Sequence, residues 1–241
     1  DTLDAYMLTG GSPVACAEIV RGRVPEYAVE IVKDWVLGEC ARSGRSRASL
    51  VAIMEYLLRR GGTPVSQAGL ARDTGLANNT VAEGYIDMLC DLMCIAPTYA
   101  WDASRKIKVR RRPRKLPFCN TMVALAWHPA QVRTVREFQQ APSEVRAMWR
   151  EWTVAQELWR RAAMAGRDSA EELQYWQGGD HEIDFVEPPG GFIEVKSGKT
   201  APVDFGWFAR VFPNRTLTVI GRNTFETSAV RGIALENFLC S

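Results

Sequence analysis

Two stretches near the C-terminus, HEIDFV at residues 181–186 and FIEVK at residues 192–196, decide which fold we expect. Both are short and rich in β-branched and aromatic residues, which is typical of strands. The sequence PPGG at residues 188–191 separates them and predicts a turn. We therefore expect the two stretches to form an antiparallel hairpin.

The spacing of charged residues on this hairpin predicts a cluster. Because side chains alternate between the two faces of a strand, Glu194 and Lys196 should share one face of the second strand. On the first strand, Asp184 should share a face with Glu182, whereas the apolar residues Ile183 and Phe185 should point the other way. Antiparallel pairing across the turn then brings Asp184 close to Glu194.

Two neighbouring carboxylates repel each other unless a cation lies between them, and Mg²⁺ or Mn²⁺ prefers such oxygen ligands. The backbone carbonyl of Val195 would add a further ligand to Asp184 and Glu194. A bound metal lowers the pKa of its water and stabilises charge on a phosphate during transfer. Lys196 would then orient the attacking water, help its deprotonation or offset charge on phosphorus. Glu157, on the preceding helix, would reach the metal directly or through a water.

The predicted catalytic set is therefore Glu157, Asp184, Glu194 and Lys196, with Asp184, Glu194 and Val195 as metal ligands. The same spacing also fits ordinary surface residues, with Lys196 paired to Glu194 outside any site. The sequence pattern leaves this alternative open.

The segment around the hairpin predicts an α/β domain over residues 121–241. Ser143 should cap a long helix that ends near Gly166. After the hairpin, FGWFARVF at residues 205–212 indicates a helix and RTLTVIG at residues 215–221 a strand. This alternation predicts a mixed sheet flanked by helices.

Residues 48–120 predict a winged helix-turn-helix. SLVAIMEYLLRR at residues 49–60 has apolar residues at helical spacing, and a short second helix should cover residues 65–74. Gly75 provides a turn, and Asn78 begins the capping sequence of a third helix. Two strand-like stretches at residues 95–101 and 106–112 follow, and we expect them to be the wing.

The expected wing carries most of a basic run, although the net charge of the chain is only +2. We expect this run to contact nucleic-acid phosphates, DNA rather than RNA. The third helix has two acids and no Lys or Arg, which disfavours sequence readout in the major groove. A solvated loop and a protein-docking wing are the alternatives. The residues of the run are Arg105, Lys106, Lys108, Arg110, Arg111, Arg112, Arg114 and Lys115.

Residues 1–47 read as apolar helices without recognisable chemistry, over residues 14–20 and 26–37 among others. Because the chain begins Asp-Thr-Leu, we expect a fragment whose N-terminal part is missing. The six cysteines contain no CxxC pair, which favours a reduced, cytoplasmic setting. No apolar stretch reaches the roughly 18 residues of a membrane span.

The sequence SGKT at residues 197–200 has the form of the end of a phosphate-binding loop, but we expect no ATP site in this chain. The full pattern needs a glycine where Ile193 stands, and Pro202 interrupts the helix that should follow.

The helix glutamate, strand aspartate, turn and strand Glu-x-Lys together resemble the PD-(D/E)XK motif of restriction-endonuclease-like nucleases. The order of YMLTGGSPVACAEIV, the helix-turn-helix, RKLPFCN and the hairpin further resembles the C-terminal region of a prokaryotic family of AAA-type ATPases. The resemblance covers nearly the whole chain and implies that an ATPase module precedes it. Two positions depart from the family pattern, Asn120 in place of an aspartate and the order Lys115-Leu116-Pro117.

We therefore expect an α+β or α/β chain with a helical segment at residues 1–47, a winged helix at 48–120 and a nuclease-like domain at 121–241. The expected function is metal-dependent hydrolysis or binding of nucleic-acid phosphodiesters. A catalytically silent module that docks DNA or protein is the main alternative, and a transcriptional regulator is a third. Oligomerisation is left open.

Overall fold

The chain forms two compact units in the computed structural model, which describes residues 2–167, 173–187 and 191–241. Asp1–Pro97 and Pro113–Gln156 form the first, which we call the helical unit. Thr98–Arg112 and Glu157–Ser241 form the second, the sheet unit. Most of the expected turn at residues 188–191 lies outside the described residues. The chain is thus of mixed α+β class, with one mixed eight-stranded sheet.

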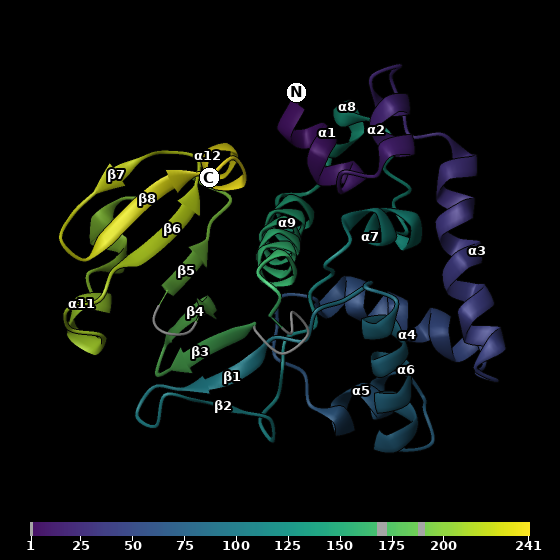
Figure 1. The fold of residues 1–241 in the computed structure, drawn as a ribbon, viewed down its shortest axis with the longest axis horizontal. Coiled ribbons are helices and arrows are strands. Elements are labelled where there is room, and N and C mark those ends of the chain that lie inside the picture. The colour runs from purple at the N-terminus through teal and green to yellow at the C-terminus, as the bar shows by residue number, and fades with distance from the viewer. Residues whose placement is uncertain (1, 168–172, 188–190) are drawn as a thin grey trace. The chain divides into compact units, whose positions relative to one another are not determined.

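The helical unit consists of short and medium-length helices joined by tight turns (Figure 1). Its first six helices, in chain order, are α1 (Thr2–Thr9), α2 (Pro13–Ile19), α3 (Glu26–Arg42), α4 (Arg47–Arg60), α5 (Gln67–Asp73) and α6 (Asn79–Asp91). Three further helices follow the excursion of the chain into the sheet unit: α7 (Thr121–Trp127), α8 (Val135–Gln140) and α9 (Ser143–Met164), whose last residues belong to the sheet unit.

Local capping explains where α4, α5 and α6 begin. The side chains of Ser46, Ser66 and Asn78 each accept a hydrogen bond from a backbone N–H in the first turn of these helices. Gly75 follows α5 with a φ of +69°, a left-handed conformation that glycine adopts at little cost. The helix, short helix, turn and helix expected between residues 49 and 91 are therefore present.

Long-range contacts tie the first and last parts of the helical unit together. The side chain of Gln156 accepts a hydrogen bond from the backbone of Thr121 and donates one to the carbonyl of Gly10. Trp149 and Trp152 of α9 are fully buried, as expected for core residues. Among the helices that the structure describes, none is both long and apolar enough to cross a membrane.

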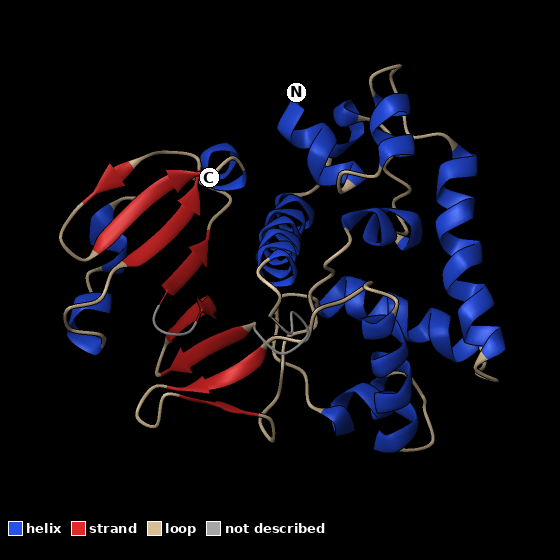
Figure 2. Cartoon of the chain, viewed as in Figure 1, coloured by secondary structure: helices blue, strands red, loops and turns tan. Residues whose placement is uncertain are grey.

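The sheet unit is built on eight strands in the order β2-β1-β3-β4-β5-β6-β8-β7 (Figure 2, red). Pairing is parallel between β1 and β3 and along β5-β6-β8, and antiparallel elsewhere. The strands are β1 (Tyr99–Asp102), β2 (Ile107–Val109), β3 (Gln174–Gly178), β4 (His181–Glu187), β5 (Gly191–Val195), β6 (Leu217–Gly221), β7 (Phe225–Glu226) and β8 (Val230–Ala234).

The hairpin β1-β2 differs from our expectation of a wing. Tyr99 and Ala100 pair in parallel with Gln174 and Tyr175 of β3, so the hairpin extends the sheet and belongs to the sheet unit. The physical reason is that β1 presents an open backbone edge, and β3 satisfies its hydrogen-bonding groups. The order of elements along the chain led us to assign this hairpin to the preceding helices. Its strand partner, β3, lies more than 70 residues later in the chain.

One face of the sheet is covered by a short helical segment that follows β5. It comprises the 3₁₀ turn η1 (Pro202–Phe205) and α11 (Phe208–Val211), where the sequence predicted one continuous helix. Phe205, Phe208 and Phe212 pack against Ile183, Val186, Phe192, Leu217, Val219 and Val230 of the sheet, and we call this set the aromatic cluster. The last helix, α12 (Leu235–Leu239), follows β8 directly.

The aromatic cluster also reveals a bulge in β4. Ile183 and Val186 both belong to the cluster, although residues three apart in a regular strand point to opposite faces. The register between β3 and β4 shifts by one residue in this interval, which contains Asp184 and Phe185. The expected regular alternation along residues 181–186 is therefore interrupted at Asp184.

Gly61, at the end of α4, is predicted to be intolerant of a side chain. A Cβ atom there would lie 2.8 Å from Nε1 of the buried Trp152 and 3.0 Å from the carbonyl oxygen of Leu57. Overpacking of this kind costs about 1–3 kcal/mol, so Gly61→Ala should lower the urea midpoint of unfolding, followed by circular dichroism.

The matched control is Gly38→Ala, within α3, where a Cβ atom would meet nothing within 4 Å. Alanine has a higher helix propensity than glycine by about 1 kcal/mol, so this variant should be at least as stable as the parent. Equal midpoints for the two variants would contradict the packing argument at Gly61.

Candidate active site

The carboxylates of Asp184 and Glu194 meet where β4 and β5 separate. The backbone pairs between these strands are Glu187–Gly191, Val186–Phe192 and Phe185–Ile193, and the pairing ends there. Continued register would place Asp184 opposite Glu194. At this position, the side chains of Asp184 and Glu194 instead accept hydrogen bonds from backbone N–H groups of the opposite strand.

Two hydrogen bonds define this crossover. Val195 donates its backbone N–H to Oδ2 of Asp184 at 2.9 Å, and Asp184 donates its own N–H to Oε2 of Glu194 at 3.3 Å. Each carboxylate is thereby held against the backbone of the other strand. The bulge in β4 permits this geometry because it turns Asp184 out of the regular ladder. The structure thus brings the side chains of Asp184 and Glu194 to the same point of the two strands, as expected from the hairpin. At Val195 the contact is made by the backbone N–H, whereas the prediction concerned its carbonyl as a metal ligand.

Lys196 directly follows β5 and forms an ion pair with the cluster. Its Nζ atom lies 2.5 Å from Oε1 of Glu194, whose side chain is 9% exposed whereas that of Lys196 is 43% exposed. Partial burial lowers the pKa of Lys196, but the negative charges of Glu194, Asp184 and Glu182 together outweigh it, so the pKa is raised. At neutral pH Lys196 is protonated, which suits it to donate hydrogen bonds and offset negative charge, and does not suit it to act as a base.

The donor set fits a divalent cation in part. Two carboxylates held within hydrogen-bonding reach of each other's backbone supply the hard oxygen ligands that Mg²⁺ and Mn²⁺ prefer. Lys196 compensates part of their charge in this arrangement. Over residues 2–167, 173–187 and 191–241, no group of three or more His, Cys, Asp or Glu side chains forms a ready-made metal cage. Backbone carbonyls and waters would have to complete the coordination.

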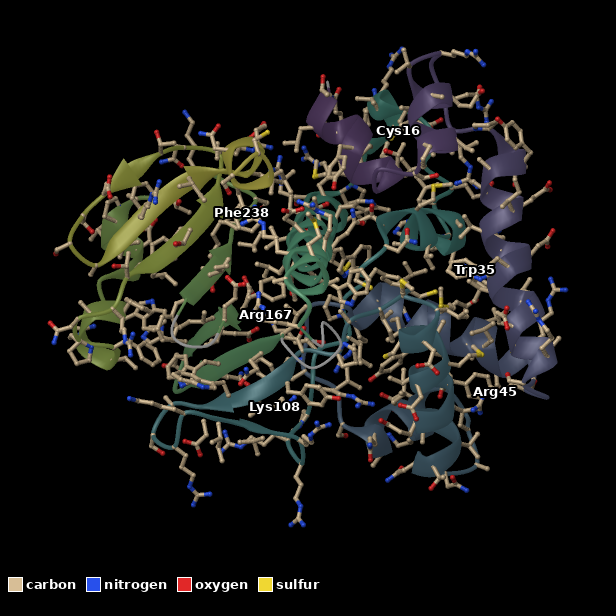
Figure 3. All side chains as sticks on the ribbon, in the orientation of Figure 1. Cys16, Trp35, Arg45, Lys108, Arg167 and Phe238 are labelled. Atoms are coloured by element: carbon tan, nitrogen blue, oxygen red, sulfur yellow. The ribbon has the colours of Figure 1, made fainter. Side chains whose placement is uncertain are left out.

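Glu157 is not joined to this cluster. It is almost completely buried, and its carboxylate accepts hydrogen bonds from Arg160, at 2.6 and 2.9 Å, and from Arg161, at 2.6 Å. Arg161 continues to the C-terminus, where it donates to the carbonyl of Phe238 and lies 4.4 Å from the centre of that ring (Figure 3 labels Phe238). Glu157 therefore fixes α12 to α9 in this structure.

The predicted basic surface divides between the two units. Arg114 and Lys115 belong to the helical unit, and their side chains are 11% and 1% exposed. Arg114 pairs with Glu83 at 2.5 Å and Lys115 with Glu151 at 3.5 Å, so their role in this structure is internal. The other six, on or beside β2, belong to the sheet unit and are exposed except for the half-buried Lys108: Arg105, Lys106, Lys108, Arg110, Arg111 and Arg112.

Sequence reasoning did not single out an aromatic stack that includes a residue of β4, the strand that carries Asp184. The ring of His181, at the start of β4, lies parallel to that of Trp207, with centroids 4.2 Å apart and an interplanar angle of 5°. Trp176 of β3 stacks on Trp207 at 6.0 Å and 14°. All three are half-buried. In the sequence, the stack is indicated only by the position of Trp176 and His181 on either side of the glycine pair Gly178-Gly179.

A pocket of about 610 Å³ lies on the opposite face of the sheet from Glu194. Thr218 and Arg231 are paired neighbours on β6 and β8 and line it together with Asn237. Glu194 is paired with Val219, which belongs to the aromatic cluster on the other face. The pocket is therefore separate from the carboxylate cluster.

Lys196→Met should alter the response of the protein to divalent cations. Loss of the ammonium increases repulsion between Asp184 and Glu194, so the unfolding temperature in EDTA should fall, and added Mn²⁺ should raise it more than in the parent. The matched control is Lys199→Met, an exposed lysine three residues further on. Differential scanning calorimetry with and without Mn²⁺ measures both shifts. Equal Mn²⁺ shifts in parent and Lys196→Met would count against cation binding at these carboxylates.

Lys115→Ala tests the internal role of this lysine. Removing one partner of a buried ion pair costs about 3–5 kcal/mol, because the other charge is left without compensation. The exposed Arg111→Ala should change the free energy of unfolding by less than about 0.5 kcal/mol. Urea unfolding of both variants provides the comparison, and similar values would refute the buried ion pair.

Comparison of the chain with protein-family models, with curated proteins and with solved structures finds no significant match.

Proposed function

We propose that the sheet unit is a metal-dependent nuclease of the PD-(D/E)XK type, acting on DNA phosphodiesters. The observation that carries this proposal is the meeting of Asp184, Glu194 and Lys196 at the point where β4 and β5 separate. Two fixed carboxylates and one protonated lysine, on adjoining strands, match the chemical needs of phosphodiester hydrolysis.

Each residue has a separate task in this proposal. Asp184 and Glu194, with the carbonyl of Val195, would hold Mg²⁺ or Mn²⁺. Such an ion, when bound, makes a coordinated water more acidic and offsets charge on the phosphate. Because Lys196 is protonated, it would donate hydrogen bonds to the attacking water or to a non-bridging phosphate oxygen.

The reaction itself is a hydrolysis. The oxygen of water forms a bond to phosphorus and gives up one proton to solvent, the bond from phosphorus to the leaving sugar oxygen breaks, and that oxygen takes up a proton from solvent. The protein contributes position and charge, and no covalent intermediate with a side chain is needed.

The alternative is a catalytically silent module that docks DNA or another protein. It is supported by Glu157, whose carboxylate is occupied by Arg160 and Arg161. The absence of a third clustered ligand among the described side chains also favours it. The two proposals differ in whether Asp184 is needed for any activity.

Asp184→Asn distinguishes the two. The amide oxygen can still accept the hydrogen bond from Val195, so the strand geometry should persist while the charge is lost. Mn²⁺ binding, measured by isothermal titration calorimetry, should disappear. Cleavage of plasmid and single-stranded DNA in Mn²⁺ should fall by roughly 100-fold or more, the scale of lost transition-state stabilisation by one charged or donor group.

The control is Glu226→Gln, which removes an exposed carboxylate from β7 of the same sheet and should leave binding and cleavage unchanged. Cleavage that is equal in parent and Asp184→Asn would refute the nuclease site. Absence of Mn²⁺ binding in the parent would favour the docking module.

A further inference from the structure

The loop that follows β5 passes over the end of β6. The two strands are parallel, and Figure 1 shows their arrowheads pointing the same way, so their carboxyl ends meet at one edge of the sheet. Beyond the last strand residue, Lys196 still donates its backbone N–H to the carbonyl of Ile220, at 2.8 Å. Glu194, the second-last residue of β5, lies at this edge. In open α/β sheets, ligands bind outside the carboxyl ends of the parallel strands.

A reciprocal pair of hydrogen bonds joins this loop to the loop after β6. Thr200 donates its backbone N–H to Oδ1 of Asn223 at 3.1 Å, and Asn223 donates its side-chain N–H to the carbonyl of Thr200 at 2.7 Å. Because both bonds involve one planar amide, they fix the two loops relative to each other. Lys199 directly precedes Thr200, and Arg222 directly precedes Asn223, so the two cations come from joined loops.

Two carbonyl groups of the loop after β5 point toward the end of β6. A Cβ atom on the buried Gly221 would have the carbonyl oxygens of Gly198 and Lys196 among its nearest neighbours, at 3.7 and 3.8 Å. In a trans peptide, the C=O and the N–H of the next residue point in opposite directions. The backbone N–H groups of Ser197 and Lys199 therefore point away from Gly221 and out of the loop.

The outward N–H groups of Ser197 and Lys199 have no acceptor within the part of the chain that the structure describes. The side chains of Lys199 and Arg222 are exposed and form neither a hydrogen bond nor an ion pair with any described residue. Gly198, between the two N–H groups, is also exposed, and a Cβ atom there would meet nothing within 4 Å. Backbone N–H groups that project from a turn beside cations are suited to bind an anion.

We propose that the loop of residues 197–200, together with Arg222, binds a phosphate of the DNA strand that is cut, next to the scissile phosphate. The backbone N–H groups of Ser197 and Lys199 and the side chains of Lys199 and Arg222 donate hydrogen bonds to its non-bridging oxygens. The loop begins one residue after Lys196, which places the bound phosphate beside the carboxylate cluster. This inference rests on the proposed nuclease function for the identity of the anion, and adds residues that position the strand.

The sequence SGKT at residues 197–200 thus has a role other than nucleotide binding. A nucleotide-binding loop is followed by a helix whose N-terminus adds further donors to the phosphate chain. Here the 3₁₀ turn η1 begins at Pro202, and the carboxylate of Asp204 accepts a hydrogen bond from the N–H of Ala201 at 2.8 Å. Two outward N–H groups and two cationic side chains match the non-bridging oxygens of one phosphodiester, and not a triphosphate.

Binding at the loop is measured first at its backbone amides, by NMR. The full 241-residue chain, labelled with ¹⁵N, is titrated with inorganic phosphate in EDTA, and with sodium chloride at equal ionic strength as the control. The amide signals of Ser197 and Lys199 should shift and saturate with phosphate and not with chloride. The double variant Lys199→Ala and Arg222→Ala should need roughly 10-fold more phosphate or more, the loss expected for one hydrogen bond to a charged group. Amides that respond equally to both salts, or to neither, would overturn the site.

DNA binding is measured in EDTA as well, so that it does not depend on catalysis. Fluorescein-labelled oligothymidylate and a labelled duplex of equal length are titrated with the full chain and followed by anisotropy. For each DNA that the parent binds, the double variant Lys199→Ala and Arg222→Ala should bind roughly 10-fold more weakly or worse. The slope of log affinity against log salt should fall by about 0.7 for the single strand and about 0.9 for the duplex, the values for one phosphate contact. Failure of the parent to bind either DNA would refute the inference.

The matched control is the double variant Arg210→Ala and Arg215→Ala, which removes two other exposed cations of the sheet unit. It should leave the amide shifts with phosphate unchanged. The exchange variant Lys199→Arg with Arg222→Lys keeps both charges at the loop and should retain most of the affinity for DNA. Equal losses of affinity in the two alanine double variants would show that only net charge matters, and would overturn the site.

Asp184→Asn separates this inference from the nuclease proposal. The variant should bind inorganic phosphate at least as tightly as the parent does, because Asp184 contributes negative charge and no donor to the loop. Phosphate binding by the parent without cleavage of either DNA in Mn²⁺ would end the nuclease proposal and leave the phosphate site. Cleavage that requires Asp184 but proceeds at the same rate in the parent and in the Lys199→Ala and Arg222→Ala double variant would end this inference and leave the nuclease.

Discussion

Two hydrogen bonds between side chain and backbone, at Asp184 and Glu194, fix the geometry of the sheet unit where β4 and β5 separate. The β4–β5 ladder must stop after Phe185–Ile193 for these carboxylates to reach the opposite backbone. The bulge in β4 makes this possible, and bulges are enriched beside active sites for the same reason, since they re-aim a side chain without breaking the sheet. The position of Lys196 then follows directly from the end of β5.

The bulge also serves the core. It turns both Ile183 and Val186 toward the aromatic cluster, which a regular strand would not allow. The same local irregularity thus increases apolar burial on one face and frees Asp184 from the ladder. A substitution that restores regular pairing at Asp184 would alter core packing and site geometry together, which is why the proposed tests change charge and preserve shape.

The parallel pairing of β1 with β3 determines to which unit the residues of the basic run belong. Beside the helix-turn-helix, the hairpin would act as a wing and its cations would belong to the helical unit. As the edge of the eight-stranded sheet, the hairpin carries Lys108 and Arg110 in the sheet unit, which also contains the two carboxylates. Arg114 and Lys115 continue the same run in sequence but turn into the helical unit, where they pair with Glu83 and Glu151. A single basic stretch therefore has two structural roles.

The elements with strong local signals could be predicted from the sequence. Capping residues and apolar periodicity predicted the helices from Arg47 to Asp91 and the long helix from Ser143, and the spacing of Asp184, Glu194 and Lys196 predicted their meeting across two strands. These predictions succeeded because capping, periodicity and hairpin pairing act over a few residues. Other features became visible only in the folded chain: the attachment of β1-β2 to β3, the bulge, the ion pairs of Glu157 with two arginines and the His181–Trp207 stack. Each of these depends on which backbone edge or side chain arrives from a distant segment, and spacing along the chain carries no information about that.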